Sequence, residues 1–476
     1  MSESSEKKSA EYQAAVTVKR PMLAMIGLLI GGFVGMLSET SLNIALPSLM
    51  AKLNVNVSTI QWLVTSYMLV IGIVLPLSSL LTKWFTTRQL VLFALADFIV
   101  GAIISALAPS FAILLIGRMI QGIAPGIILP LMYTVATLIF PPYRLGTAMG
   151  MIGLVIMFAP AIGPTLSGII LGALSWHWIF WTFVPFLLIA AFLAYKYLPN
   201  VTKITKPKVD ILSIALSTIG FGSLVTGVSL ASSHGWNSPL VLGILVFALL
   251  VLAAYIYRQL HSTNPILNFH VFKKPNFRIG AILIILDFGI IISSMYLLPM
   301  FWQNGLDIAV ALTGIVMLPG GIVNAIVSAI SGRLFDRLGA RLLAASGFLI
   351  VIVGIVMLLF ATPTSAMWYV ILAHIIIMIG APLAMSPAQT FGLNALDVHS
   401  TGDGSTIMNT FQQMMGAVAT AVATSLLAVG QHASSAPESS RTAFTNGVHY
   451  GLIFPLVLAV IAFLISFKIN DKSEGK

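Results

Sequence analysis

Long apolar stretches recur along the whole chain and are separated by short polar or basic segments. Each stretch has roughly twenty residues, the length that an α-helix needs to cross a hydrocarbon core of about 30 Å. The pattern therefore predicts fourteen membrane-spanning helices. The expected spans cover residues 21–46, 60–81, 90–107, 111–139, 145–171, 179–198, 211–229, 239–257, 279–301, 309–330, 342–360, 368–389, 405–429 and 447–467.

The order of these spans divides the chain into parts. Six spans come first, a basic linker and two spans follow, and a polar connector leads into six more. We therefore predict an all-α integral membrane protein with two six-helix bundles and two additional transmembrane helices between them. Transporters built from repeated halves bind substrate near the membrane midplane, between those halves. The expected parts are an N-terminal tail (1–20), an N-terminal bundle (21–200), a linker with the two extra helices (201–262), a C-terminal bundle (263–467) and a C-terminal tail (468–476).

The composition agrees with a membrane protein and excludes several kinds of chemistry. Hydrophobic residues make up 58% of the chain and charged residues 8%, and the mean hydropathy is +1.01, whereas roughly a quarter of a soluble chain is charged. The chain has no cysteine, which excludes disulfides, thiolate metal sites and cysteine nucleophiles. It also has no Gly-x-x-x-x-Gly-Lys-Ser/Thr phosphate loop, so we do not expect nucleotide-driven pumping by this chain alone. We expect no metal site, no cofactor and no enzymatic activity.

The net charge of +10 is explained by the orientation of the spans. If the chain starts in the cytoplasm, 21 of its 24 lysines and arginines fall in cytoplasmic tails, loops or loop edges. This asymmetry follows the positive-inside rule. It predicts that both termini are cytoplasmic, and that the positive charge faces anionic lipid and not nucleic acid.

Four charged residues lie well inside the spans, away from their ends: Glu39, Asp97, Asp287 and Arg118. A charge at that depth costs from about 3 to over 10 kcal/mol, so it is rarely retained without a partner or a task. At about 1.5 Å per residue, Glu39 lies about 27 Å along its helix, in the same outer half of the membrane as Arg118. These depths allow an ion pair between Glu39 and Arg118, with backbone carbonyls as alternative partners of the arginine. The carboxylates are candidates for proton binding. A structural role is the alternative for Asp287, and for the polar run around Glu39 it is a polar knot that holds helices together.

Two glycine-containing segments have demanding spacing. The loop at 331–341 combines glycines with Asp336 and arginines, which predicts a charge lock between helix ends at the cytoplasmic face; a basic loop with incidental glycine is the alternative. The span at 145–171 contains Pro160 and Pro164 among glycines, which predicts a bent helix with close packing. Ordinary small-residue packing is the alternative there.

These segments together resemble the major facilitator superfamily, specifically its fourteen-span drug:proton antiporter family. The resemblance covers essentially residues 21–467, and it has two departures: the family usually carries Asp where this chain has Glu39, and the loop at 80–90 lacks the Gly and Asp of the loop at 331–341. The motifs that carry it are the first-span polar run around Glu39, the fourth-span Arg118, the fifth-span antiporter motif (Gly150, Pro160, Gly163, Pro164, Gly168) and the cytoplasmic gate (Gly332, Asp336, Arg337, Gly339).

The resemblance implies roles for further residues. Asp287 lies on the counterpart of the helix that carries Glu39, and carboxylates on equivalent helices would both face the central cavity. Asp97 lies on a helix away from that path, so a structural role is as strong an expectation for it as proton coupling. For His374 a hydrogen-bonded core position is favoured over a proton relay. The expected cavity wall, with packing as the alternative for each member, consists of Gln61, Tyr67, Met132, Tyr133, Trp181, Trp302, Asn324, Asn409, Phe411 and Gln412.

The function that the resemblance implies is a multidrug efflux antiporter of the plasma membrane. It would export lipophilic, often cationic, antimicrobial compounds in exchange for protons and would act as a monomer. Its partners would be small-molecule drugs, protons and the lipid bilayer. The alternatives are a proton-coupled exporter of a specific metabolite or lipid and, from another class, a non-transporting membrane sensor or a membrane-embedded enzyme.

Overall fold

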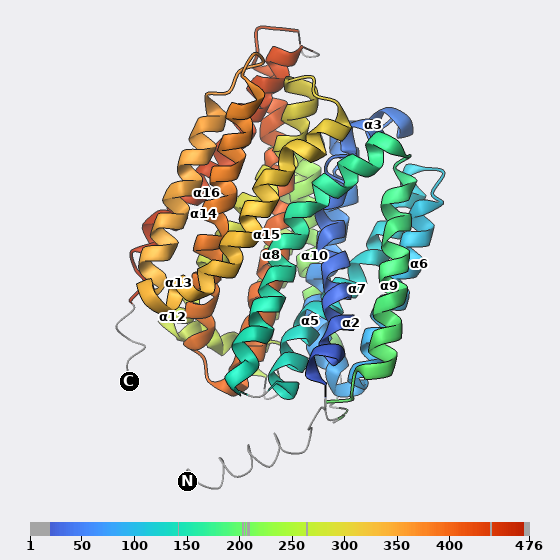
Figure 1. Ribbon diagram of the computed structural model, residues 1–476, viewed down its shortest axis with the longest axis vertical. Coiled ribbons are helices and arrows are strands. Elements are labelled where there is room, and N and C mark those ends of the chain that lie inside the picture. The colour runs from blue at the N-terminus through green and yellow to red at the C-terminus, as the bar shows by residue number, and fades with distance from the viewer. Residues whose placement is uncertain are drawn as a thin grey trace.

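The computed structural model describes residues 20–470, except 141, 202–203, 205, 207–209, 263–264 and 438–439. This part of the chain is helical, and it contains no strand. The long helices run roughly parallel to one another as an upright bundle (Figure 1), with α2 beginning and α16 ending toward the same side. The helices of the first part are α2 (Pro21–Ser41), α3 (Leu46–Leu53), α4 (Val57–Ile60), α5 (Trp62–Trp84), α6 (Thr87–Ala106), α7 (Phe111–Ile139), α8 (Pro142–Ala173) and α9 (His177–Tyr197).

The remaining helices belong to the hairpin between the halves and to the second half. The hairpin is α10 (Ile211–His234) and α11 (Pro239–His261), and a short 3₁₀ turn, η1 (Phe269–Lys273), follows it. The second half contains α12 (Pro275–Met300), the π-helical turn η2 (Phe301–Gly305), α13 (Val310–Leu359), α14 (Met367–Asn394), α15 (Val398–His432) and α16 (Arg441–Ser466).

Every expected span has a helix. Twelve helical segments of the described chain are long and apolar enough to cross a membrane, and the two arms of α8, bent by 45°, form a thirteenth. The segment Trp62–Ser78 of α5 is apolar but shorter, and it occupies the place of the remaining expected span. Helix α13 holds two spans, joined at Gly339, whose φ of 77° lies in the left-handed region that favours glycine.

The first span ends earlier than its apolar pattern predicts. Helix α2 stops at Ser41, and a turn precedes α3, where the sequence had suggested one helix to residue 46. Hydroxyl and amide side chains cause this difference because they compete for backbone hydrogen bonds. Here the Ser41 hydroxyl donates to Leu37 O at 2.6 Å, and the amide of Asn43 donates across to Met295 O at 3.3 Å.

Two seams join the halves. Helix α8 packs against α13, and α5 packs against α15, while α10 of the hairpin touches both α5 and α15. The hairpin therefore lies over the α5–α15 seam and contacts both halves. An aromatic cluster strengthens this attachment, because the rings of Phe221 on α10 and Phe272 in η1 both contact Phe411 of α15.

A bidentate ion pair closes the base of the hairpin. Asp210 caps α10, accepts two 2.9 Å hydrogen bonds from Arg258 and accepts others from Ser213. The guanidinium of Arg258, followed by Ser213, lowers the pKa of Asp210 from 3.8 to about 2. The folded protein therefore gains this stabilisation fully above pH 3.8 and loses it as the pH falls toward 2.

Replacing Asp210 by Asn is expected to destabilise the protein only slightly. The side chains of Arg258 and Asp210 are 43% and 24% exposed, so solvent screens the pair, and the loss should not exceed about 1 kcal/mol. Thermal unfolding in detergent measures it. At neutral pH the variant should melt below the parent protein, and the difference should shrink as the pH falls below 3.8. A difference independent of pH would contradict the ion-pair explanation.

Candidate functional site

A fully buried arginine organises the polar centre of the first half. Arg118 of α7 donates to Leu63 O at 3.1 Å, to Ser38 O at 3.2 Å, to the Ser38 hydroxyl at 2.6 Å and to the Gln121 side chain at 3.1 Å. Its guanidinium also lies 4.0 Å from the ring centroid of Tyr67 on α5. The arginine thus ties α2, α5 and α7 together.

These contacts decide between the two partners expected for Arg118. No ion pair between Glu39 and Arg118 is found within the described residues, and the arginine donates to two backbone carbonyls and to the side chains of Ser38 and Gln121. The flat face of Tyr67 supplies further compensation, since an aromatic ring attracts a cation. Tyr67 is itself fixed, because its hydroxyl donates to Gly35 O at 2.7 Å.

Replacing Arg118 by Lys is expected to cost about 2–4 kcal/mol of stability and most of the transport activity. An ammonium cannot reproduce the planar set of donors or the stacking on Tyr67, so buried acceptors lose their partners. Thermal unfolding and drug export would be measured together. Arg258→Lys, at an exposed position, is the control and should change both little. Parent-like behaviour of Arg118→Lys would show that the charge alone suffices.

Glu39 is fully buried at the boundary between the halves. Neither carboxylate oxygen has a hydrogen-bond partner of good geometry within the described residues. The side chain of Gln413, on α15 of the other half, lies next to the carboxylate, and the charge of Arg118 and the ring of Tyr67 lie within electrostatic reach. The Gln413 amide oxygen is likewise buried without a partner. A proton on Glu39 could be donated to that oxygen and would satisfy both groups.

The bent helix α8 is locked to α2 beside Glu39. Pro164 has no N–H to donate to the carbonyl of Pro160, four residues earlier. The hydroxyl of Thr40 takes that place and donates to Pro160 O at 2.7 Å. A Cβ at Gly163 would lie 2.9 Å from Leu37 O, so only glycine permits this approach. The tandem prolines therefore leave the Pro160 carbonyl free as an acceptor, and Thr40, the residue after Glu39, donates to it.

The end of the structure away from the start of α2 is closed by contacts between the halves. Helix α8 meets α13 at two glycines: a Cβ added at Gly168 would lie 2.7 Å from the Gly314 Cα. Next to this contact, Asn43 donates to Met295 O, and Gln303 in the π-helical turn donates to Ile44 O at 3.1 Å. Each half thus donates a side-chain amide to a backbone carbonyl of the other.

The other ionisable residues singled out from the sequence are dispersed. Asp287 is fully buried on α12, which packs against α14, α15 and α16, and its oxygens lack hydrogen bonds within the described residues. Asp97 is half-buried on α6, which packs against α7 and α9. His374 lies in the core of the second half with its ring 5.7 Å from that of Trp302, edge to face. Neither ring nitrogen of His374 has a hydrogen bond in the described chain, unlike the expectation for this residue.

The residues of the expected cavity wall have varied surroundings. Tyr133 accepts a 3.3 Å hydrogen bond from Gln389 and so bridges α7 and α14 of opposite halves. Phe411 faces the hairpin aromatics, and Trp181 lies on α9, which packs against α2 and α6. Of the remaining members, Gln61, Met132 and Gln412 are buried, Asn324 lies 3.7 Å from the Met378 sulfur, and Asn409 donates to Ser405 O. Their binding role stays a prediction.

For two motif residues the structure describes the helix but not the surroundings of the residue. Nothing is described of the surroundings of Gly150 in α8 or of the Asp336 side chain in α13. In the same loop Arg337 is exposed, and a Cβ at Gly332 would meet open space. The charge lock at this loop therefore stays a prediction.

Sequence reasoning found some of the residues that join helices and halves and missed others. The polar run around Glu39, which was singled out, contains Thr40 and Asn43. Gln413 and Gln303, which lie in the opposite half, were missed, although Gln412, the neighbour of Gln413, was selected. The signal was the run of two glutamines within an apolar span. The period of the helix alone could not show which glutamine faces Glu39.

Comparisons with known proteins agree with this architecture. Residues 28–420 match the model of the Major Facilitator Superfamily. The chain is 46% identical over 474 residues to the lincomycin resistance protein LmrB of Bacillus subtilis (strain 168), covering 98% of each chain. It is 44% identical to the protein of that name from Listeria innocua, over 95% of this chain and 97% of the other. The fold also matches a crystal structure of a POT family transporter, with a TM-score of 0.70 at 14% identity over 96% of this chain and 99% of the other.

Proposed function

The chain belongs to the major facilitator superfamily, and we propose that it is a multidrug efflux transporter that exchanges drugs for protons. Near-full-length similarity to lincomycin resistance proteins supports drug export. Lipophilic, often cationic, antimicrobial compounds are the proposed substrates. The proposed location is the plasma membrane, with both termini cytoplasmic as the distribution of lysine and arginine indicates.

The observation that carries proton coupling is the position of Glu39. This carboxylate is buried between the halves, it has no hydrogen-bond partner of good geometry among the described residues, and it faces an amide from the opposite half. A protonated Glu39 can donate to Gln413 and hold α2 against α15. Loss of the proton removes that donor and leaves a full charge buried between the halves, which the Gln413 amide N–H alone can contact and which needs a further partner, such as Arg118 or a cationic substrate.

This arrangement links protonation to the movement of the halves. The end away from the start of α2 is closed by the Gly168–Gly314 contact and the reciprocal amide bonds. With both termini in the cytoplasm this end would face the outside, so the described state would be closed toward the outside. Protonation of Glu39 would favour this state. Proton release to the cytoplasm and drug binding would then favour the opposite one, and linkage requires that proton and drug oppose each other through the same two states.

Everted membrane vesicles test the proposal. A proton gradient is formed across them, and lincomycin, the compound named for the relatives, is added. Antiport predicts that the compound discharges the gradient and accumulates in the vesicles. Accumulation that persists after an ionophore has removed the gradient would contradict proton coupling, and no effect of any antimicrobial compound would favour a specific metabolite or lipid as substrate.

A further inference from the structure

A narrow apolar slot lies between α2, α8 and α9. Its volume is about 490 Å³, within the range of small-molecule sites. The residues of α2 that line it run from Ile26 to Leu37, about 16 Å along the helix at about 1.5 Å per residue. Its lining consists of Ile26, Leu29, Ile30, Phe33, Val34 and Leu37 of α2, Val155 and Leu166 of α8, and Thr182, Phe183 and Phe186 of α9.

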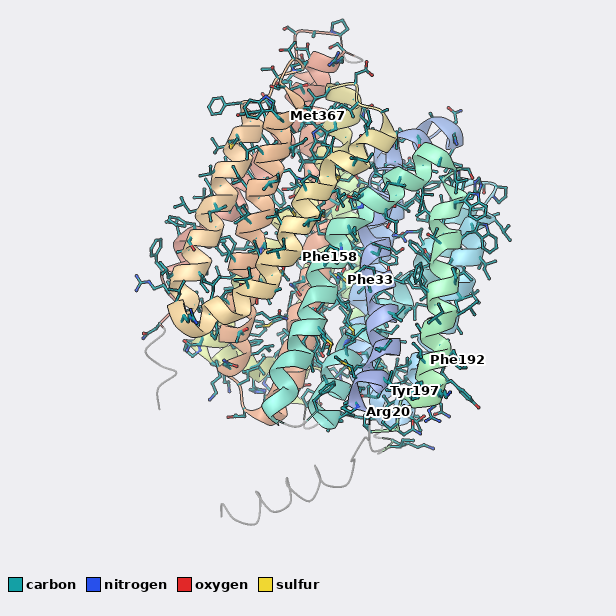
Figure 2. All side chains as sticks on the ribbon, in the orientation of Figure 1. Arg20, Phe33, Phe158, Phe192, Tyr197 and Met367 are labelled. Carbon is teal, nitrogen blue, oxygen red and sulfur yellow. The ribbon has the colours of Figure 1, made fainter. Side chains whose placement is uncertain are left out.

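The slot exists because α2 touches its two neighbours at different heights. Toward the cytoplasmic end α2 packs on α9, where a Cβ at Gly27 would lie 2.8 Å from Ala190 O. Toward the external end α2 packs on α8 through the Thr40–Pro160 hydrogen bond. Between these contacts the bent α8 and α9 diverge. Phe33 borders the slot with its ring 6.3 Å from that of Phe158 on α8 (Figure 2).

The chemistry of the lining selects the occupant. Ten of the eleven lining side chains are apolar, and the hydroxyl of the remaining one, Thr182, donates to Ile179 O at 2.7 Å. The slot therefore offers no charge and no unused hydroxyl donor to a polar ligand. Its rim is open, with Phe186 54% exposed and Leu166 37% exposed, and its floor is closed, with Val34 only 3% exposed. The helices α2 and α9 are long and apolar enough to span a membrane, and the exposed side chains of the rim are apolar, so the rim would face hydrocarbon there.

We propose that this slot binds one acyl chain of a bilayer lipid. Its length, its apolar lining and its opening toward the hydrocarbon match an aliphatic chain and exclude a cationic head group. The bound chain would support the face of α2 that borders the slot, up to Leu37, two residues before Glu39. The inference rests on the membrane-spanning fold and not on proton coupling.

Photolabelling of the purified full-length protein tests the site. The protein is reconstituted in nanodiscs of phosphatidylglycerol and phosphatidylethanolamine that contain a phospholipid with a mid-chain diazirine, and labelled peptides are mapped by mass spectrometry. We expect labels to concentrate on lining residues of α2, α8 and α9. Leu166→Trp narrows the slot, whereas Ile169→Trp places the same bulk on an exposed position of α8 outside the lining.

Leu166→Trp should reduce slot labelling by about threefold or more. Within lipid an acyl chain gains nothing from leaving water, so only packing contacts hold it in the slot, and the indole ring takes the place of those contacts. Thr182→Phe is a second blocking variant, and Ile169→Trp should label like the parent protein.

Labels spread evenly over exposed membrane faces, or equal losses in Leu166→Trp and Ile169→Trp, would overturn the proposal. Displacement of the label by lincomycin would assign the slot to substrate and overturn the lipid assignment. Elution of each variant as a single species from a size-exclusion column shows that it is folded. None of these measurements requires transport.

Discussion

Replacing Glu39 by Gln is expected to abolish export against a concentration gradient while the protein stays folded. The amide has nearly the shape of a protonated carboxyl group and can still donate to Gln413, but it cannot release a proton. The transporter would then remain in the state that is closed toward the outside. Drug resistance in an efflux-deficient host and accumulation in everted vesicles should both fall by at least about tenfold, equivalent to about 1.4 kcal/mol.

The control is Glu39→Asp, which keeps a carboxylate and installs the residue that the drug:proton antiporter family usually carries. It should retain pH-dependent export, although its shorter side chain weakens the contact with Gln413. Asp287→Asn belongs in the same series, because Asp287 is the second candidate for proton binding. If Glu39→Gln still exports drug against a gradient with unchanged pH dependence, Glu39 is not the coupling residue.

Replacing Gly168 by Val is expected to prevent closure of the end of the structure that we propose faces the outside. A Cβ at this position would lie 2.7 Å from Gly314 Cα and 2.9 Å from Gly314 N, and backbone atoms cannot rotate away as a flexible side chain would. Helices α8 and α13 must therefore separate at their external ends, which would also strain the bonds made by Asn43 and Gln303. Transport should fall because the protein can no longer alternate between its two states.

A single cysteine can report this opening, because the chain has none of its own. Thr165 lies beside the seam and is only 2% exposed. Thr165→Cys should react with a membrane-impermeant maleimide added outside at least about tenfold faster in the Gly168→Val background. The reason is that the open state, a minor state of a few per cent in the parent protein, becomes the major one. Gly153→Val is the matched control on the same helix, where a Cβ would meet no atom within 4 Å. Unchanged labelling in Gly168→Val would show that the glycine contact does not hold the seam closed.

The buried charges show how far sequence reasoning reaches. The cost of placing Arg118 in a membrane span predicted that it must have partners, and the structure contains them. Depth along a helix suggested Glu39 as one partner, but depth does not give the direction in which a side chain points. In the fold Arg118 turns to Ser38, Leu63 and Tyr67, and Glu39 faces Gln413.

The proline motif shows a similar division. Pro160 and Pro164 predicted a bent helix, and α8 is bent by 45°. The sequence could not show that the Pro160 carbonyl, freed by Pro164, would accept a hydrogen bond from Thr40, 120 positions away. Likewise, the sequence could not show that Phe411, expected in the cavity wall, would contact an aromatic ring of the hairpin.

The sequence by itself determined the membrane-spanning helices, their division into six, two and six, and the charged residues that need an explanation. These properties follow from local quantities: the length of an apolar run, the cost of a buried charge and the missing N–H of proline. Only the tertiary structure decided which polar groups meet, where the halves touch and where an apolar slot remains open. Those outcomes depend on helix rotation and on contacts between distant segments, and neither is encoded in a local pattern.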